Sequence, residues 1–386
     1  MPVLNERPME RNLIVCFDGT SNQFGANDTN VVRLVQALER CDERQIVYYD
    51  PGVGTLPEPG LLTAAAQRIS EIFGLAFGVG LTAKIERAYA FLMHNWQPGD
   101  RVFLFGFSRG AYTARALAGL LHMFGLLAPS HENLLPYVMR LFRGSRRVAD
   151  QESKIWRVSA QFRNTFARDA GVEHHRFRVH FVGVWDTVAS VGWIWDPVKF
   201  RYTAANPSIV TVRHAVAIDE RRSFFRQNLF AADVRGQNLL ELWFPGSHSD
   251  VGGGYPESYG GLWREPFTWM VDEAKKAGLL TDPGREQRVL NRVPAPEQPW
   301  SEPLHESLMG VWWWAEFFPK LRYNNRVGRR LPSFGLGRRR RIEPGALLHR
   351  SVLQRMESVD GYAPPNLPRK QSMTRLVRDT EDVIRV

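Results

Sequence analysis

The sequence has little cysteine and no long uninterrupted hydrophobic run. Cys16 and Cys41 are its only cysteines, and neither lies in a C-x-x-C pair, so neither a disulfide framework nor a thiolate zinc site is indicated. The most apolar long stretch, residues 61–81, carries Arg68 and Glu71, which predicts buried or amphipathic helices and no membrane span. The first twelve residues lack the apolar segment of a cleaved leader. We therefore expect a soluble protein that is cytoplasmic when synthesised.

Acidic residues are absent from residues 320–341, which contain nine basic ones. The net charge of the chain is +10, so this segment accounts for nearly all of it. Such a local excess indicates a surface feature, and aromatic side chains beside arginines suit an anionic membrane. The alternative is that the aromatic residues complete the core and the arginines form a solvated face. The candidate membrane contacts are Trp312, Trp313, Trp314, Arg338, Arg339, Arg340 and Arg341.

The pattern of apolar runs predicts an α/β fold. Short apolar runs that read as buried strands alternate with stretches of helical spacing, which is typical of a mostly parallel sheet with helices on both faces. From about residue 300 the chain becomes rich in aromatic, basic and proline residues, which predicts appended loops and helices. We therefore expect a catalytic domain over residues 10–300 and an extension over residues 301–386 packed on it.

Four polar residues each follow a predicted strand. They are Asp18, Ser108, Asp186 and His248. The carboxyl ends of parallel strands meet at one edge of a sheet, where sites on such sheets are found. These four positions are therefore the main candidates for a site.

Ser108 lies in the motif Gly106-Phe107-Ser108-Arg109-Gly110, which matches the G-x-S-x-G nucleophile elbow. The motif needs a strand before it and a helix after it, and "VFLFG" and "AYTARALAGLL" provide both. In that setting the serine oxygen stands at the apex of a sharp turn. The backbone N–H of Arg109 then faces the anion that forms during attack. This context favours a nucleophile over a serine that merely starts a helix.

A serine nucleophile needs a base and a carboxylate that orients the base. Among the histidines after Ser108, His248 alone follows a strand and lies in a glycine-rich loop. Asp186 ends a strongly apolar strand, where an aspartate is costly unless an imidazole or similar group pairs with it. Three other aspartates could orient the base: Asp18, Asp219 and Asp250. A salt bridge with Arg221 or Arg222 is a sufficient explanation for Asp219, and we expect Asp250 to shape its loop or bind a cation.

The turn Asp18-Gly19-Thr20 raises a competing class of enzyme. "LIVCFDGT" looks like the start of a haloacid-dehalogenase-type phosphatase, in which an aspartate two residues before Asp18 is the nucleophile. Cys16 holds that position here, so this covalent route has no carboxylate nucleophile. We expect the turn to line the pocket instead, with the N–H of Gly19 or Thr20 as the second oxyanion donor.

Taken together, these segments resemble a known family. "FDGTSNQ", "GDRVFLFGFSRGAYTARALAG", "VGVWDTVASVG", "HAVAIDERRSFF" and "HSDVGGGY" are similar to the α/β-hydrolase domain family that includes the phospholipase effectors of bacterial type VI secretion. The resemblance implies a lipase-like domain that hydrolyses esters, with glycerophospholipids as substrates in the effector members. The family's serine, aspartate and histidine fall on Ser108, Asp186 and His248.

The interpretation is therefore a serine ester hydrolase that uses no cofactor and no metal. Its partners would be a lipid or ester substrate and an anionic membrane surface, with no nucleic acid, because no nucleic-acid-binding motif accompanies the basic run. The resemblance also implies export and a secretion-system or immunity partner, which the sequence does not identify. Two alternatives stay open. One is a catalytically idle hydrolase fold that acts as a binding module, and the other is a protein that associates with membranes through its basic segment.

Overall fold

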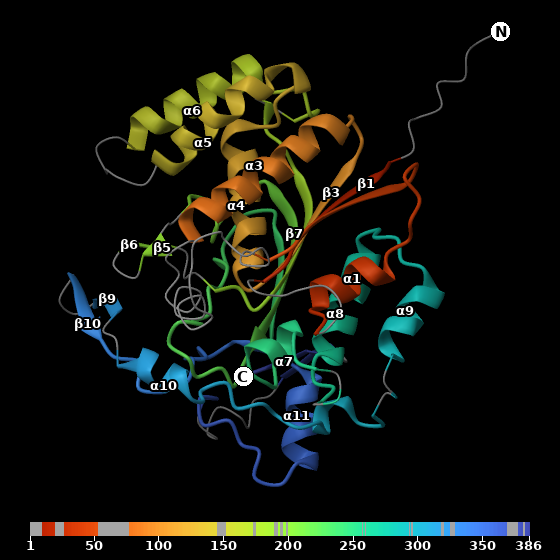
Figure 1. Cartoon of the computed structure of the whole chain (residues 1–386), viewed down its shortest axis with the longest axis vertical. Coiled ribbons are helices and arrows are strands. Elements are labelled where there is room, and N and C mark those ends of the chain that lie inside the picture. The colour runs from red at the N-terminus through yellow and green to blue at the C-terminus, as the bar shows by residue number, and fades with distance from the viewer. Residues whose placement is uncertain are drawn as a thin grey trace, which may run out of the picture.

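A nine-stranded sheet forms the centre of the molecule, with strand order β12-β13-β11-β8-β7-β4-β3-β1-β2 (Figure 1). The computed structural model describes residues 10–19, 27–52, 77–144, 152–172, 175–188, 192–193, 196–197, 200–256, 258, 260–292, 294, 296–317, 320–324, 329–368, 377–380 and 383–386. The predicted helices at residues 61–76 lie outside these residues. The strands of the sheet are β1 (Asn12–Phe17), β2 (Gln45–Asp50), β3 (Arg101–Phe107), β4 (Val179–Trp185), β7 (Ile209–Ala217), β8 (Asn238–Phe244), β11 (Leu347–His349), β12 (Val377–Thr380) and β13 (Val383–Arg385).

The strand order changes direction beside β1. β1 pairs in parallel with β2 on one side, and the chain then returns across it to place β3 on the other side. β4, β7, β8 and β11 follow in parallel, β13 pairs antiparallel with β11, and β12 pairs antiparallel with β13. In open parallel sheets, ligands bind at the carboxyl ends of strands beside such a reversal. The ends of β1 and β3 are therefore the place to look for a site, and the fold is α/β-hydrolase-like, as the sequence predicted.

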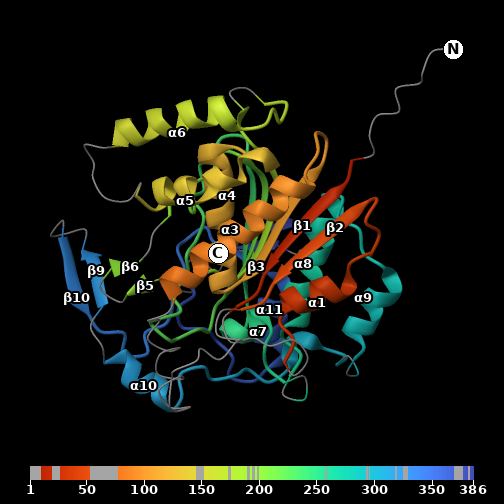
Figure 2. The ribbon, with the colours of Figure 1, turned by 45° about the horizontal axis from the view of Figure 1, so that its top comes forward.

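Helices cover both faces of this sheet (Figure 2). Alternate residues of β1 point to opposite faces, so Leu13 and Val15 lie in one apolar core while Ile14 and Cys16 lie in the other. Strands buried on both faces read as continuous apolar runs, which explains "NLIVCF". One face carries α3 (Phe77–Asn95), α4 (Arg109–Phe124), α5 (Leu135–Gly144) and α6 (Glu152–Phe166), and the other α1 (Asn30–Ala37), α8 (Arg264–Lys276) and α9 (Pro283–Leu290).

The segment after residue 300 takes part in the central sheet. β11, β12 and β13 extend the sheet beyond β8, so the sheet itself crosses the boundary expected at residue 300. The expectation of only loops and helices there was wrong, because these strands have three or four residues and too little alternation to be recognised. The remaining elements are α7 (His248–Gly252), α10 (Val311–Glu316), α11 (Arg350–Ser358), the hairpin β9 (Lys320–Asn324) and β10 (Arg329–Ser333), the pair β5 (Gly192–Trp193) and β6 (Asp196–Pro197), and the 3-10 helices η1 (Pro129–Leu134) and η5 (Pro299–Ser301). Among the described helices, none combines the length and the apolar character that crossing a bilayer requires.

Candidate active site

Ser108 lies in the turn between β3 and α4, in a backbone conformation with φ 59° and ψ −119°. Such a conformation costs on the order of 1–3 kcal/mol and persists only where the surroundings impose it. The two glycines of the motif, Gly106 and Gly110, allow the close packing that imposes this conformation on Ser108. A Cβ on Gly106 would lie 2.6 Å from the backbone of Gly110, and a Cβ on Gly110 would lie 2.2 Å from the Phe17 carbonyl oxygen. The helix therefore starts in direct contact with the end of β1, which leaves the serine at the apex of the turn.

His248 is the first residue of α7 and faces Ser108. Its Nε2 lies 2.8 Å from Ser108 Oγ, and its Nδ1 contacts Asp186 Oδ2. A carboxylate only accepts hydrogen bonds, so Nδ1 carries the proton and Nε2 is the acceptor for the serine hydroxyl. The rings of Phe107 and Phe225 both pack against the imidazole, with centroid distances of 4.6 and 4.8 Å. These rings fix its orientation and shield it from water.

Asp186 follows β4 and is fully buried. Its Oδ1 accepts a hydrogen bond of 2.9 Å from the backbone N–H of Ala217 at the end of β7. Its backbone is in the left-handed region with φ 40°, and the next residue is held by a second histidine. The N–H of Thr187 donates to His214 Nε2 at 3.2 Å, and His214 Nδ1 in turn donates to Glu241 at 2.7 Å. The turn that presents the carboxylate is therefore fixed from both sides.

The protonation states in this cluster follow from burial and charge. Burial lowers the pKa of the His248 imidazole, and the hydrogen bond and charge of Asp186 offset this only in part. Burial would raise the pKa of the Asp186 carboxyl, but the charge of Arg340 and the hydrogen bond from His248 outweigh it and hold that pKa well below its usual range. At neutral pH the cluster therefore contains a neutral imidazole and an ionised carboxylate, as a general base and its orienting group require.

The oxyanion donors are only partly as expected. The N–H of Gly19 donates to the carboxylate of Asp18 at 2.6 Å, so it is already engaged, and Thr20 lies outside the described residues. Asp18 also accepts from the hydroxyls of Thr29 and Tyr49, at 2.9 Å each, and so holds the turn after β1. Arg109 is the first residue of α4 and directly follows Ser108. Arg109 therefore stays the candidate with a suitable position.

The loops around the triad candidates are held by other carboxylates. Asp250 accepts from Ser247 and from His305 Nδ1, at 2.8 and 2.5 Å, and in this way it shapes the loop that carries His248. The expected salt bridge of Asp219 with Arg221 or Arg222 was wrong. The ion-pair partner of Asp219 is Arg339, at 3.2 Å. Within the part of the chain that the structure describes, no group of three or more His, Cys, Asp or Glu residues is placed to hold a metal ion.

Glu220 is a site residue that the sequence analysis missed. It is buried, accepts the backbone N–H of His248 at 3.2 Å and pairs with Arg222 at 2.9 Å. Burial would raise its pKa, but the hydrogen bonds and charge of Arg222 lower it to about 2. The charged run "DERR" soon after a strand was the available signal, but the sequence analysis assigned a salt bridge only to Asp219 and gave Glu220 no role.

The candidate membrane contacts separate into exposed and buried residues. Trp313 and Trp314 are exposed, whereas Trp312 is half-buried, with its ring centroid 5.2 Å from that of Phe225. Arg338, Arg339 and Arg341 are exposed. Arg340 is only 5% exposed and forms an ion pair with Asp186, so its assignment as a membrane contact is corrected.

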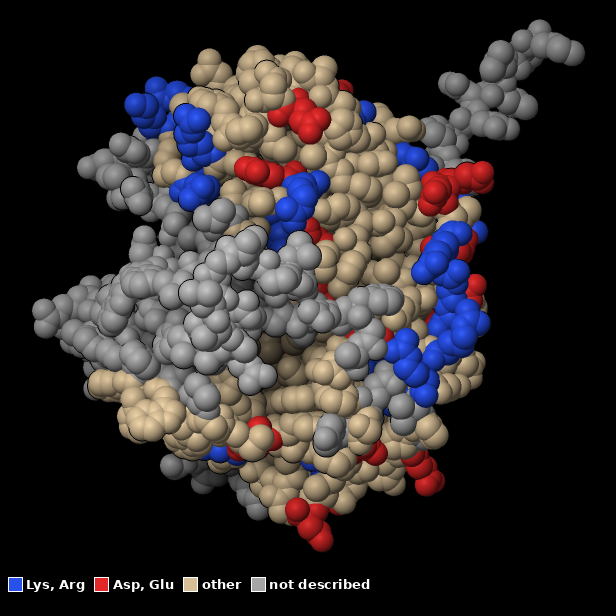
Figure 3. Space-filling model, in the orientation of Figure 1, with Lys and Arg blue, Asp and Glu red and all other residues tan. Residues whose placement is uncertain are grey.

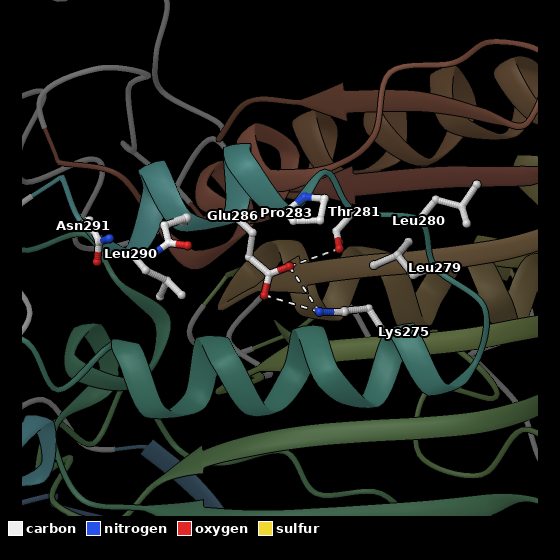
Figure 4. A pocket seen from close by; sticks show the side chains of 9 residues that line it. Lys275, Leu279, Leu280, Thr281, Pro283, Glu286, Leu290 and Asn291 are labelled. Atoms are coloured by element: carbon white, nitrogen blue, oxygen red, sulfur yellow. Dashed lines mark hydrogen bonds and ion pairs between the residues drawn. The ribbon is translucent and has the colours of Figure 1, made fainter.

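A separate pocket of about 540 Å³ lies between α8 and α9 (Figure 4). None of the residues discussed above lines it. Its polar groups bond to one another, since Glu286 accepts from Thr281 at 3.0 Å and pairs with Lys275 at 3.3 Å. We therefore assign no part of the chemistry to this pocket.

A family model described as the catalytic domain of T6SS phospholipase effectors, Tle1-like, matches residues 11–273. The uncharacterized protein YEL023C of Saccharomyces cerevisiae is 34% identical over 229 residues, which are 57% of this chain and 33% of the yeast protein. The chain thus spans about a third of the length of that relative.

Solved structures show weaker likeness. An uncharacterized protein from Pseudomonas aeruginosa matches 75% of this chain and 49% of its own with 20% identity and a TM-score of 0.45. The Tle1 effector bound to the VgrG spike of the type VI secretion system matches 64% of this chain and 52% of its own, with 21% identity and a TM-score of 0.34. Esterase 2 of Thermogutta terrifontis matches 71% of this chain and 87% of its own, with 11% identity and a TM-score of 0.35.

Proposed function

The chain belongs to the family of T6SS phospholipase effector Tle1-like catalytic domains, and from this we propose that it is a serine hydrolase that cleaves carboxylic esters of glycerophospholipids. The observation that carries the serine mechanism is the 2.8 Å approach of His248 Nε2 to Ser108 Oγ, with the serine at a strained strand-to-helix turn. A hydroxyl at the apex of such a turn, next to a neutral imidazole, is the arrangement that nucleophilic catalysis requires.

In the first half of the proposed reaction, Ser108 Oγ attacks the ester carbonyl carbon while His248 Nε2 takes the hydroxyl proton. The imidazolium that forms is stabilised by Asp186, which accepts from Nδ1. The backbone N–H of Arg109 supports the negative charge on the former carbonyl oxygen, aided by the positive end of the α4 dipole. When the carbon–oxygen bond breaks, His248 gives its proton to the leaving alcohol, and the acyl group stays on Ser108.

In the second half, a water molecule replaces the alcohol. His248 removes a proton from the water, the resulting hydroxide attacks the acyl carbon, and the proton returns to Ser108 Oγ as the fatty acid leaves. The rings of Phe107 and Phe225, packed against the imidazole, keep bulk water from solvating it during both halves. The same three side chains thus act twice, with the imidazole alternating between base and acid.

A fluorophosphonate probe tests whether the serine is activated. We expect the wild-type protein to gain one phosphonyl group on the peptide that contains Ser108, as measured by mass spectrometry, because the probe reacts with serines whose base is in place. The matched control is Ser223→Ala, which removes a serine outside the triad and should be labelled like the wild type. Absence of labelling in folded wild-type protein would instead favour the catalytically idle binding module.

We further propose that the exposed apolar residues around α10 contact the surface of a lipid aggregate. Six of the eight large hydrophobic residues that are exposed among the described ones gather there. Figure 3 shows neutral side chains over α10, at the lower left. Interfacial tryptophan is a usual anchor at membrane surfaces, and Arg338 and Arg341 are exposed nearby in the chain. The six residues are Met309, Trp313, Trp314, Phe317, Phe334 and Leu336.

Trp314 is the sharpest test of this surface, because it is 74% exposed. Trp314→Ala should weaken partitioning onto anionic phosphatidylglycerol vesicles roughly tenfold, since one buried aromatic side chain contributes on the order of 1.5–3 kcal/mol. Its kcat on a soluble short-chain ester should stay unchanged. Trp156→Ala, on α6 at the far end of the molecule in Figure 1, is the control and should partition like the wild type. Equal partitioning of both variants would contradict a role for α10.

Export and a secretion partner extend the proposal, and they rest on the family membership alone. The Tle1 effector has been solved bound to a VgrG spike. We propose a spike-type protein of a type VI secretion system as a partner of this chain. Size-exclusion chromatography of the two purified proteins tests this, and separate elution at micromolar concentrations would argue against it.

A further inference from the structure

We propose that Arg340 is a positioning residue for the triad, which holds the carboxylate of Asp186 in the orientation that His248 needs. The inference rests on the proposed serine mechanism and deepens it. The family match ends at residue 273, so Arg340 comes from a part of the chain that the match does not include. The segment 335–341 is on this view a part of the active site.

The contacts of Arg340 are those of a two-point clamp. Its Nη1 lies 2.5 Å from Asp186 Oδ1 and its Nη2 lies 2.9 Å from Oδ2, so the planar guanidinium faces both carboxylate oxygens. Its remaining hydrogen bonds go to the carbonyl oxygens of Ala217, at 3.0 Å, and of Phe225. A lysine offers a single charged nitrogen and reproduces this fork poorly. With the N–H of Ala217 and with His248, the carboxylate receives two hydrogen bonds on each oxygen.

The two carbonyl partners connect the clamp to the rest of the site. Ala217 ends β7 and also donates to Asp186, while Phe225 packs its ring against His248. Arg340 therefore joins the acid, the end of β7 and the loop that shields the base. A side chain in this position fixes how Asp186, the end of β7 and the loop of Phe225 lie relative to one another, in addition to neutralising the charge of Asp186.

The segment that carries Arg340 is itself tied to the same loop. The carboxylate of the buried Glu316 accepts from the N–H groups of Ser223 and Gly337, at 2.6 and 3.2 Å. Arg339 pairs with Asp219, directly before Glu220. Gly337 and Arg339 both precede Arg340 closely in the chain, so the guanidinium is delivered by a segment fixed at more than one point.

Arg340 also changes the electrostatic setting of His248. The groups that face the imidazole are Asp186, Glu220, Arg222 and Ser108, while Asp250 faces Ser247 and His305 instead. The positive charge of Arg340 compensates part of the negative charge of Asp186. That negative charge stabilises the protonated, imidazolium form of His248. Without the guanidinium, the whole negative charge of Asp186 acts on His248, so the pKa of His248 should rise. A residue with a purely structural role would not shift this value upward.

The test measures kcat, KM and the pH dependence of kcat/KM on a soluble short-chain ester. Arg340→Met and Arg340→Lys should lower kcat at least tenfold with KM within about threefold, because positioning acts on the reacting groups and not on substrate binding. In Arg340→Met the acid limb of the profile should move to higher pH. Titration of the His248 ring by NMR should show the same upward shift without any turnover. Arg143→Met is the matched control, since Arg143 is an exposed arginine in the last turn of α5, and it should behave like the wild type.

A double-mutant cycle separates positioning from general destabilisation. If Arg340 acts through Asp186, then Arg340→Met should have little further effect on kcat in an Asp186→Asn background. The double variant also removes the charge that Arg340→Met alone would leave unpaired, so it serves if the single variant fails to fold. An equal fractional loss in both backgrounds, an unmoved acid limb, or a kcat within twofold of the wild type would each overturn the inference. None of these results would affect the proposed function, which falls if the wild type and Ser108→Ala are equally active or equally inactive.

Discussion

Ser108→Ala should abolish ester hydrolysis while the protein stays folded. The expected loss in kcat is on the order of 10⁴- to 10⁶-fold, because the acyl-enzyme route disappears and only the oxyanion donors and binding remain. Alanine fits the space of the serine and meets the same backbone conformation, so the free energy of unfolding should change by less than about 1 kcal/mol. The measurement is a parallel assay of wild type and variant on a panel of phospholipids and short-chain esters, with circular dichroism to check folding.

Two further results decide how the Ser108→Ala experiment is interpreted. A variant that turns over esters at the wild-type rate would show that Ser108 is not the nucleophile, whatever its distance from His248. Thr113→Ser, a change of a buried hydroxyl residue within α4 outside the triad, is the companion variant and should retain activity. The panel also identifies the preferred ester, which the fold does not specify.

Gly110→Ala should strongly destabilise the fold. The new Cβ would lie 2.2 Å from the Phe17 carbonyl oxygen and 2.6 Å from that of Asp18, and both atoms belong to the backbone. Neither can move without displacing the end of β1 or the start of α4. We expect a loss of about 3 kcal/mol in the free energy of unfolding, measured by urea denaturation, together with loss of activity.

The control for this prediction is Gly144→Ala at the end of α5. A Cβ there meets no atom within 4 Å, so the change should be neutral or slightly stabilising, since alanine favours helix more than glycine does. If Gly110→Ala unfolds at the same urea concentration as the wild type, the close approach of α4 to β1 is not needed for the fold.

Much of the fold and of the candidate site could be predicted from the sequence, because both depend on local patterns. β3 contains the run "VFLFG" and α4 contains "AYTARALAGLL", as the motif around Ser108 predicted. The position after a strand selected four candidates, Asp18, Ser108, Asp186 and His248. The structure contains contacts of His248 with Ser108 and with Asp186. These signals are readable because a buried strand and a tight turn each restrict several consecutive residues.

Long-range pairing between charged residues was not predictable. Arg340 is separated from Asp186 by 154 positions and stands in a run of four arginines, three of which are exposed. Nothing in "RRRR" distinguishes the one that turns inward, because that choice depends on how Glu316 and Gly337 hold the segment. Glu220 was missed for a related reason. A carboxylate among arginines is usually a surface group, and its burial became apparent only from its bond to the His248 backbone.

The three C-terminal strands β11, β12 and β13 affect how exposed the edge of the sheet is to aggregation. β8 reads "NLLELWF" and pairs with β11 along its outer side, so without β11 it would offer an apolar row of unpaired N–H and C=O groups to other chains. In the whole chain the outermost described strand on that side is instead β12, and β11 and β13 lie between it and β8. A fragment that ends at residue 300 would thus expose a template for intermolecular pairing. We expect such a fragment to aggregate more readily than the whole chain.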